Sequence, residues 1–441
     1  MGQDDSQSSW LIVREPVIRN LFVLIFVLGF VGGVLRFLFP FQIVNLGGSE
    51  SLVSWGSSLS SIGQVIGLIV LSKLIGKQRS ALVVSGVLLT ILGMVTGFAA
   101  TPDWIVFARI AEGAGAGLLT IIIIRISSGF ESYRGESVGT LLSAVFLGSA
   151  IGQGSAGILI GQLETVLLIS QTEAIMTLGF VLTVVSFLMI ISLIPFIGDV
   201  EQFCVDDKDK NHGHSHTRIA LRSLLSKKLL ILLAIYILYD FSHGLYTPGL
   251  SLMINSNGVS VDQIGLGYLI GDAVWGASQL FTGRFVDRTG SIAPLAISLV
   301  AKGFIVVLYP FAASFMVLTS LLAIAGLSEG FLEPARNDAA MELTPTNTTV
   351  HSHRHYFIGH APGNPFSITS HDHEHTHESG SDEIVSLLQT IGIIGFAFGS
   401  SGGGWLLSQG STLVDLVFMG GFILVFAGIL TVGLRSKKKA E

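Results

Sequence analysis

The chain has 441 residues, of which 50% are hydrophobic and 12% are charged, and its formal net charge is −6. Its mean hydropathy of +0.70 excludes a soluble globular protein and indicates a chain that folds in lipid. The single cysteine, Cys204, excludes an intramolecular disulfide and a cysteine-based metal or redox site.

Apolar stretches long enough to cross a bilayer, about 20 residues each, recur along the whole chain. The first six are expected at 20–44, 52–72, 80–100, 103–125, 138–161 and 171–195. The last six are expected at 229–253, 262–283, 291–310, 315–335, 384–408 and 412–434. The sequence therefore predicts an all-α membrane protein with 12 transmembrane helices.

Glycine-rich stretches of the first half recur in the second half. The run that begins at Gly113 in the fourth span has its counterpart at Gly326 in the tenth. Gly148 in the fifth span has its counterpart at Gly395 in the eleventh, at a larger separation. An insertion therefore lies between the tenth and eleventh spans, at about 344–382. Internal repeats of this kind are typical of transporters built from two related halves.

The repeat divides the chain into two pseudo-symmetric bundles of six helices. We expect an N-terminal bundle over 1–197 and a central cytoplasmic loop over 198–228. The C-terminal bundle is expected over 229–441 and carries the insertion.

The distribution of basic residues predicts the orientation in the membrane. Of the 24 Lys and Arg residues, all but Arg36, Arg109 and Lys302 fall in the termini or in loops on one side of the predicted spans. Positive charge accumulates on the cytoplasmic side of membrane proteins. We therefore expect a multi-pass protein of the plasma or inner membrane with both termini in the cytoplasm.

Three motifs can be compared with a known family. Residues 283–290 read Gly-Arg-Phe-Val-Asp-Arg-Thr-Gly, residues 109–115 read Arg-Ile-Ala-Glu-Gly-Ala-Gly, and residues 148–154 read Gly-Ser-Ala-Ile-Gly-Gln-Gly. They resemble the cytoplasmic loop motif, the helix 4 motif and the helix 5 antiporter motif of the major facilitator superfamily. The resemblance covers nearly the whole membrane part and implies a secondary transporter whose two bundles rock around a central site.

The resemblance also implies a cytoplasmic latch, in which an acid and arginines interact at the helix ends. The residues that match it are Gly283, Arg284, Asp287, Arg288 and Gly290. Two departures from the family pattern stand out. Lys73 occupies the position of the family acid in the first-half loop, and Gln153 replaces the antiporter proline, which weakens an antiporter assignment.

Charged residues within the spans concentrate on the first, fourth, seventh and tenth, which line the cavity in the family that the chain resembles. An ionisable group in hydrocarbon costs several kcal/mol unless it is paired or faces water. We therefore expect a transport cavity that contains Arg36, Arg109, Glu112, Asp240, His243, Glu329 and Glu333.

The spacing of the acids suggests a coupling role. Asp240 and His243 are three residues apart, and Glu329 and Glu333 are four apart, so each pair projects from one helical face. We hypothesise that Asp240 and Glu329 are the coupling acids, because carboxylates beside a partly dry cavity can bind and release a proton. Glu333 and Arg336 lie near the cytoplasmic end, where a gate-closing ion pair is the alternative to a substrate contact.

Other charges have structural alternatives. Arg36 or Arg109 could simply neutralise Glu112, since all three lie at similar depth. Lys302 is isolated on the ninth span, and we expect Asp272 on the eighth span to pair with it.

Histidines are concentrated in two loops outside the spans, at alternate positions. The tracts are His212, His214 and His216; His351, His353 and His355; and His371, His373, His375 and His377. Alternate residues of an extended chain point the same way, and imidazole favours ions such as Zn and Ni. The tracts therefore predict metal binding in the cytoplasm, and the alternative is disordered polar filler. We expect that no cofactor is required.

The sequence favours a proton-coupled exporter of a small molecule or ion, with a divalent metal as a candidate substrate or regulator. The alternatives are an exporter of cationic organic compounds or drugs with regulatory metal-binding loops, and a non-transporting membrane metal sensor. An enzyme is not expected, because the sequence has no nucleotide loop or nucleophile elbow. Nucleic-acid binding is not expected either, because the basic residues follow the membrane surface. We expect a monomer in the lipid bilayer.

Overall fold

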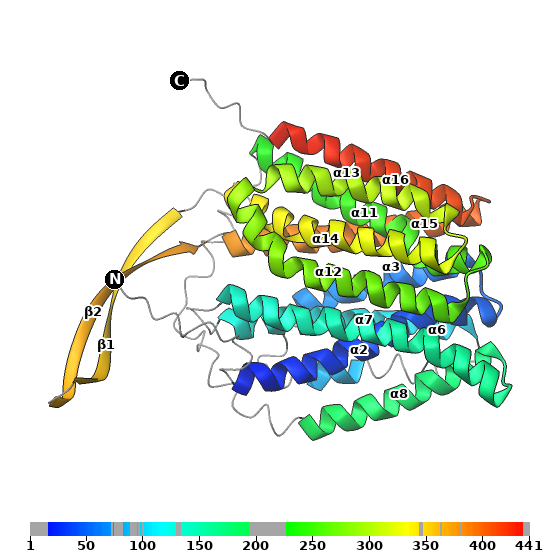
Figure 1. Ribbon diagram of the computed structural model, residues 1–441, viewed down its shortest axis with the longest axis horizontal. Coiled ribbons are helices and arrows are strands. Elements are labelled where there is room, and N and C mark those ends of the chain that lie inside the picture. The colour runs from blue at the N-terminus through cyan, green and yellow to red at the C-terminus, as the bar shows by residue number, and fades with distance from the viewer. Residues whose placement is uncertain are drawn as a thin grey trace.

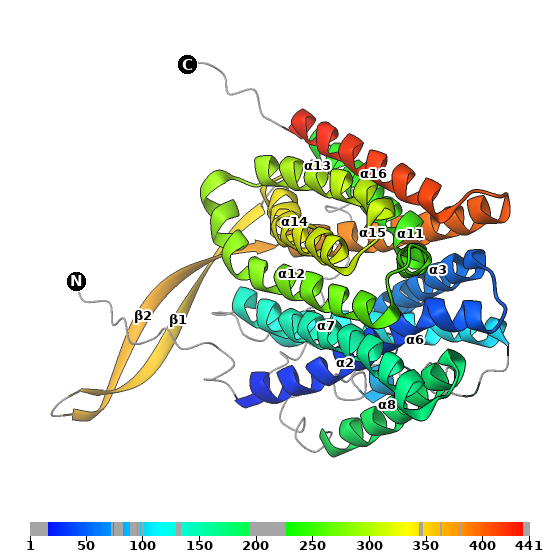
Figure 2. The same cartoon turned by 45° about the vertical axis from the view of Figure 1, so that its right-hand side comes forward.

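The computed structural model describes residues 16–71, 74, 83–88, 95, 98, 101–128, 134–193, 226–343, 347–361, 364–379 and 381–434. Long helices that run side by side make up the body of the molecule, and a two-stranded hairpin projects from one end (Figures 1 and 2). The helices of the first half lie together, and those of the second half lie together beside them (Figure 1).

Eleven long helices lie in the described part of the chain. Those of the first half are α2 (Pro16–Asn45), α3 (Glu50–Ile66), α6 (Pro102–Ser128), α7 (Arg134–Leu167) and α8 (Gln171–Leu193), and a π-helical segment, η2 (Gly67–Leu71), extends α3. Those of the second half are α11 (Lys227–Ser256), α12 (Val261–Thr289), α13 (Ile292–Leu308), α14 (Phe315–Glu342), α15 (Ser381–Ser408) and α16 (Leu413–Leu430). Short 3-10 segments follow α13, at η6 (Tyr309–Phe311), and α16, at η7 (Thr431–Leu434).

Each of these eleven helices overlaps one of the twelve predicted spans. Helices are expected there because hydrocarbon requires every backbone polar group to be satisfied within the segment. Nine helices in the described part are long and apolar enough to cross a membrane. Local signals set some of their ends. The Ser226 side chain accepts a hydrogen bond from the backbone N–H of Leu229 at the start of α11, and Thr412 and Asp415 form a reciprocal cap at the start of α16.

Close backbone contacts show that helices pack in parallel pairs within each half. A side chain on Gly113 or Gly117 of α6 would collide with the backbone of Ser60 or Gln64 of α3, in that order along both helices. The end of α3 therefore lies on the side opposite to the beginning of α6. The predicted span at 80–100 falls between them, and there the structure describes 83–88 as helical together with two single residues.

Glycines confirm the internal repeat. Gly152 of α7 meets the backbone of Phe30 in α2, and its counterpart Gly399 of α15 meets the backbone of Phe241 in α11. The same two contacts therefore hold the first and fifth helices of each half together. Small residues permit such close approach where lipid provides no hydrophobic attraction between helices.

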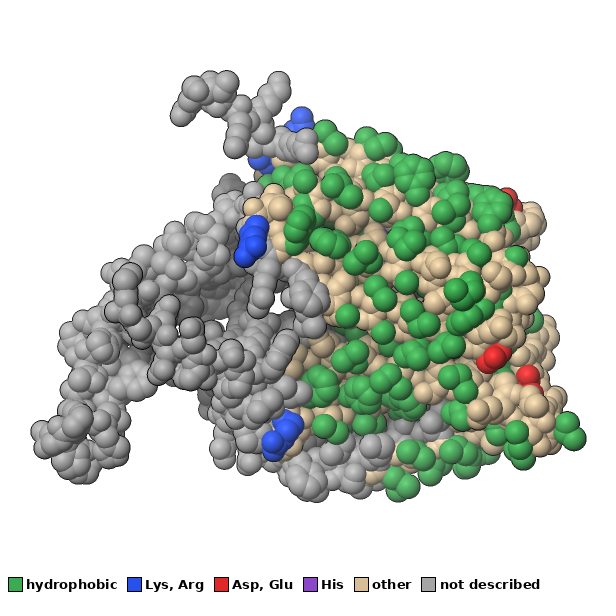
Figure 3. All heavy atoms as spheres, in the orientation of Figure 1, with side chains coloured by type: hydrophobic (Ala, Val, Ile, Leu, Met, Phe, Trp, Pro, Cys, Tyr) green, Lys and Arg blue, Asp and Glu red, His purple; other side chains and the backbone are tan. Residues whose placement is uncertain are grey.

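The surface of the helical body is apolar, as a lipid-facing surface requires. Phe304 of α13 and Phe422 and Phe426 of α16 are examples of large exposed hydrophobic side chains. In Figure 3, hydrophobic side chains cover the visible face, Lys and Arg lie near the hairpin end, and Asp and Glu lie near the opposite end. This distribution fits a multi-pass membrane protein.

The helix pairs α7 with α12 and α3 with α15 make the most extensive contacts between the halves, and α11 also contacts α2 and α3. In the first pair, Gln153 Nε2 donates a hydrogen bond to Asp272 Oδ2 at 2.9 Å. In the second pair, Ser58 Oγ and Ser401 Oγ form a hydrogen bond of 2.7 Å. Gln153 and Asp272 lie near the middle of their helices. Ser58 and Ser401 lie towards the helix ends that are opposite to the side on which α2 begins and α16 ends. The halves therefore close together on the side opposite to the termini.

The insertion between α14 and α15 contains an antiparallel hairpin of β1 (Asn347–Ala361) and β2 (Asn364–Ser379). It extends away from the helical body on the side where α2 begins (Figure 2). In its register, His351 is opposite His375, His353 is opposite His373, and His355 is opposite His371.

Candidate transport cavity

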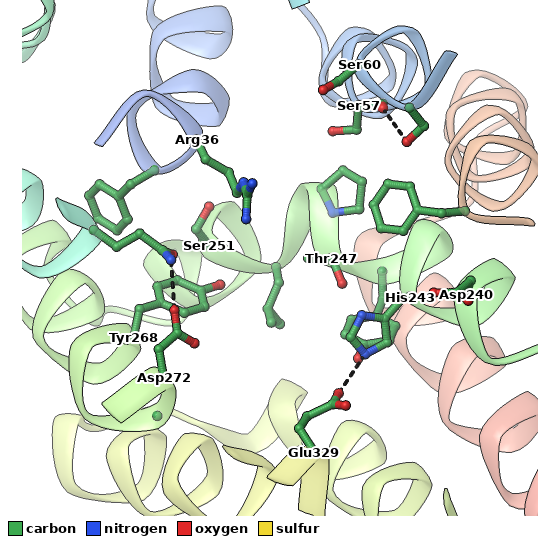
Figure 4. Close-up of a pocket in the computed structure, with 18 of the residues that line it drawn as sticks. Arg36, Ser57, Ser60, Asp240, His243, Thr247, Ser251, Tyr268, Asp272 and Glu329 are labelled. Atoms are coloured by element: carbon green, nitrogen blue, oxygen red, sulfur yellow. Dashed lines mark hydrogen bonds and ion pairs between the residues drawn. The ribbon is translucent and has the colours of Figure 1, made fainter. Parts of the chain in front are cut away.

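A cavity of about 500 Å³ lies between the two halves. Its lining comes from α2, α3, α6 and α7 of the first half and from α11, α12, α13, α14 and α15 of the second. Hydroxyl, aromatic and charged side chains face the same space in Figure 4. This volume can hold a small organic molecule.

Glu329 of α14 is the most heavily bonded acid of the cavity. Lys302 Nζ lies 2.9 Å and His243 Nε2 lies 3.1 Å from its Oε1, while the Tyr239 hydroxyl donates to its Oε2 at 2.5 Å. Figure 4 shows the contact between His243 and Glu329. The side chains of Glu329 and Lys302 are only 6% and 7% exposed, so the lysine compensates a carboxylate that water scarcely reaches.

This arrangement corrects one expectation from the sequence. Lys302 pairs with Glu329 and not with Asp272. Although Asp272 also lines the cavity, its hydrogen bond comes from Gln153. A charged side chain on a peripheral helix is thus explained by a partner on the neighbouring α14.

A second cluster surrounds Arg336, also on α14. Its guanidinium lies 3.2 Å from Asp240 Oδ2 and 2.9 Å from Glu333 Oε1. The same group lies over the rings of Tyr236 and Tyr239, at 4.4 and 4.9 Å from the ring centroids. One buried cation therefore holds two acids, and aromatic faces complete its surroundings.

In the first half, Arg109 and Glu112 form an ion pair on one face of α6, and both are buried. Ser60 Oγ donates a hydrogen bond to Glu112 Oε2 at 3.1 Å, and the guanidinium lies 4.5 Å from the centre of the Phe39 ring. Arg109 therefore neutralises Glu112, which is one of the two pairings considered from the sequence.

Arg36 differs from these cations. It lies on α2, is exposed, and lines the cavity, and it has no ion-pair partner in the described part of the chain. Figure 4 shows it across the space from Asp272, in the direction of Ser251 and Tyr268.

The structure brings all seven predicted cavity residues to one cavity, from helices α2, α6, α11 and α14. The latch can be placed only in part. Arg288 is exposed near the end of α12, and Gly290 follows that helix with a φ of +79°. Gly283, Arg284 and Asp287 lie on α12, but the side chains of Arg284 and Asp287 are outside the part that the structure describes.

The predicted metal ligands can be placed less fully. His212, His214 and His216 lie outside the described residues, and the tracts at 351–355 and 371–377 are described by their strands and register alone. Among the described side chains, no cluster of three or more His, Cys, Asp or Glu residues is arranged to hold a metal ion.

Sequence reasoning did not assign three residues to the cavity, although it singled out Asp272 and Lys302 as an expected pair. Tyr239 bonds Glu329, Asp272 joins the halves with Gln153, and Lys302 compensates a buried acid. Each is a polar or charged residue near the middle of an apolar stretch. That position was the available signal, but it did not reveal the partner.

Comparisons with known proteins agree with this architecture. The model of the Major Facilitator Superfamily matches residues 21–352. A crystal structure of the nucleoside transporter NupG has a TM-score of 0.63 at 15% identity and covers 95% of this chain and 98% of that one. A mutant of that transporter has a TM-score of 0.65 at 14% identity and covers 95% and 100%. Identities this low show the shared fold alone. No curated protein sequence matches the chain.

Proposed function

Because the chain belongs to the major facilitator superfamily and has the fold of a secondary transporter, we propose that a proton gradient drives it to move a small solute through the central cavity. The solute would bind between the halves, and the halves would open alternately to the two sides of the membrane.

The observation that carries this proposal is the pair of charged clusters on one side of the cavity. Glu329 is held by Lys302 and His243, and Asp240 is held by Arg336. A proton that binds either carboxylate removes its negative charge and so releases its cationic partner in a poorly hydrated site. Protonation is thereby linked to rearrangement of α11 and α14.

Alternating access requires the closed side to open. The contacts that would break include the hydrogen bond from Gln153 to Asp272 and the close approach of Gly157 to Gly265. Both join α7 to α12. A rigid-body tilt of one half would separate them without unfolding a helix.

We infer export as the direction of transport. The glycine pattern of α7 resembles the antiporter motif, although Gln153 stands in place of its proline. The glycines of α7 approach both neighbours of that helix. Gly152 approaches α2, whereas Gly157 approaches α12. The helix is therefore placed to transmit movement between its own half and the other.

The test uses everted membrane vesicles with an imposed proton gradient, reported by a pH-sensitive dye. Candidate metals, cationic drugs and organic acids are added one at a time, and a compound that dissipates the gradient identifies coupled export. Asp240→Asn and Glu329→Gln should abolish the response, whereas Asp103→Asn, at an exposed acid outside the cavity, should retain it. An unchanged response in both cavity variants would refute the assigned coupling residues.

A second candidate function is metal-dependent regulation through the hairpin. Three His-His pairs occupy alternate positions of its register, and residues directly opposite in an antiparallel pair have Cβ atoms about 5 Å apart. Imidazole as a ligand type suits Zn or Ni. The cavity acids already have cationic or amide partners, which favours metal as a regulator over metal as the solute.

Metal titration of the purified protein tests the regulatory role. A variant with Gln in place of the six paired histidines should lose Zn binding by calorimetry, and its transport should become insensitive to added Zn. Full Zn binding in that variant would remove the hairpin as the site.

A further inference from the structure

The cavity contains one cation and one acid that form no ion pair with an oppositely charged side chain in the described part of the chain. The cation is Arg36 of α2, in the first half. The acid is Asp272 of α12, in the second half, whose hydrogen-bond donor Gln153 is a neutral amide.

The remaining cavity charges are satisfied internally. Arg109 is bound to Glu112, Lys302 to Glu329, and the acids near α14 share Arg336. A solute that approached those clusters would have to displace a buried ion pair, which costs several kcal/mol. Arg36 requires no such displacement, since it is exposed to the cavity.

We propose that Arg36 and Asp272 form a two-point recognition site for a small organic solute. Arg36 binds an anionic group of the solute, and Asp272 accepts a hydrogen bond from a donor or cationic group at its other end. This inference rests on the proposed transport through the cavity and names the class of solute. Guanidinium groups bind carboxylates and phosphates in bidentate geometry.

The lining between the two charges fits an organic molecule better than a bare ion. In Figure 4, Ser251 lies near Arg36 and Tyr268 lies near Asp272, and Thr247 is exposed to the same space. Hydroxyl and aromatic groups supply hydrogen bonds and apolar contact. A metal ion would instead be repelled by the unpaired guanidinium.

A solute bound in this way would touch both halves of the molecule. Arg36 belongs to the first half and Asp272 to the second, and Asp272 is also an acceptor in the contact that closes the halves. A group that takes over Asp272 competes with Gln153 for the carboxylate. Binding of the solute is thus tied to the closed side of the cavity.

The charge of the site can be tested without knowing the solute. The single native cysteine allows a Cys204→Ser background in which Thr247→Cys places one thiol in the cavity. Its labelling rates are measured with an anionic and a cationic methanethiosulfonate reagent, the ethylsulfonate and the ethyltrimethylammonium. We expect the ratio of anionic to cationic rate to fall about tenfold in Arg36→Gln and to be kept in Arg36→Lys.

Matched controls separate a local charge from a general effect. Lys228→Gln removes one exposed positive charge at the start of α11 and should leave the ratio unchanged. Ser408→Cys places an exposed thiol at the end of α15, on the side of the molecule opposite to the start of α11. Arg36→Gln should not alter the ratio of anionic to cationic labelling rate at this thiol.

Protection of the Thr247→Cys thiol tests recognition directly. Benzoate and β-alanine should slow the labelling, and the uncharged benzamide should not. Asp272→Asn should weaken protection by β-alanine, whose amine it would bind, more than protection by benzoate. An unchanged labelling ratio in Arg36→Gln, or equal protection by benzoate and benzamide, would overturn the proposal.

The labelling test is independent of proton-driven transport. If the charge bias and acid-specific protection hold while the vesicle assay shows no proton coupling, the recognition site stands and the coupling fails. If vesicles show proton-coupled export while the bias is absent, the transport function stands and this site fails.

Discussion

Replacing Lys302 with Met tests whether the lysine is needed to keep Glu329 buried. The two groups are 2.9 Å apart, and both side chains are less than a tenth exposed, so solvent screens their attraction poorly. Breaking a buried ion pair by removing one partner costs about 3–5 kcal/mol. We expect a loss near the lower end, about 3 kcal/mol, because Tyr239 and His243 still contact the carboxylate.

The assay is equilibrium unfolding of the purified protein in detergent for the two single variants and the double variant. Glu329→Gln should also destabilise, since it leaves Lys302 without its acid. The double variant should recover most of the loss, which gives a coupling energy of about 2–3 kcal/mol in a double-mutant cycle. Strictly additive losses, or a Lys302→Met loss below about 1 kcal/mol, would refute the view that this pair is a buried, mutually dependent unit.

Three further predictions concern packing and the closed side. Gly152→Leu should abolish folded protein in membranes, because its side chain would meet the α2 backbone, whereas Gly32→Ala, with open space around it, should be tolerated; yield and size-exclusion profile measure both. Gln153→Leu removes the donor to Asp272, worth about 1.5–3 kcal/mol, and should increase cysteine labelling from the closed side; unchanged labelling would contradict a closing role. Tyr239→Phe should lower stability by about 1–3 kcal/mol, and an unaltered unfolding midpoint would contradict the hydrogen bond to the buried carboxylate.

The helices could be predicted from the sequence because length and apolarity are local properties. The expected span at 412–434, for example, appears as α16 and η7 over Leu413–Leu434. The repeat was also visible, since Gly152 and Gly399 mark equivalent contacts in the two halves. The fold therefore follows largely from patterns that one segment carries by itself.

The partners within the cavity could not be predicted in the same way. Lys302 was matched with the wrong acid because sequence distance says little about which neighbouring helix faces it. On the side where α2 begins, α13 also begins, and α12 and α14 end. Counted in residues from that side, Lys302 is closer in depth to Glu329 than to Asp272, but this count can be used only once the helix packing is known. Gln153 was recognised as a departure from a motif, yet its bond to the other half needed the structure.

The meeting of Gly157 and Gly265 has a mechanical consequence. At this point the two helices touch backbone to backbone, whereas elsewhere α7 and α12 also meet through side chains, such as Gln153 with Asp272. A backbone contact of this kind offers little steric resistance when one helix tilts against the other. Glycine thus provides close helix contacts both inside each half and between the halves, and the contact between the halves would permit the tilt that the proposed transport requires.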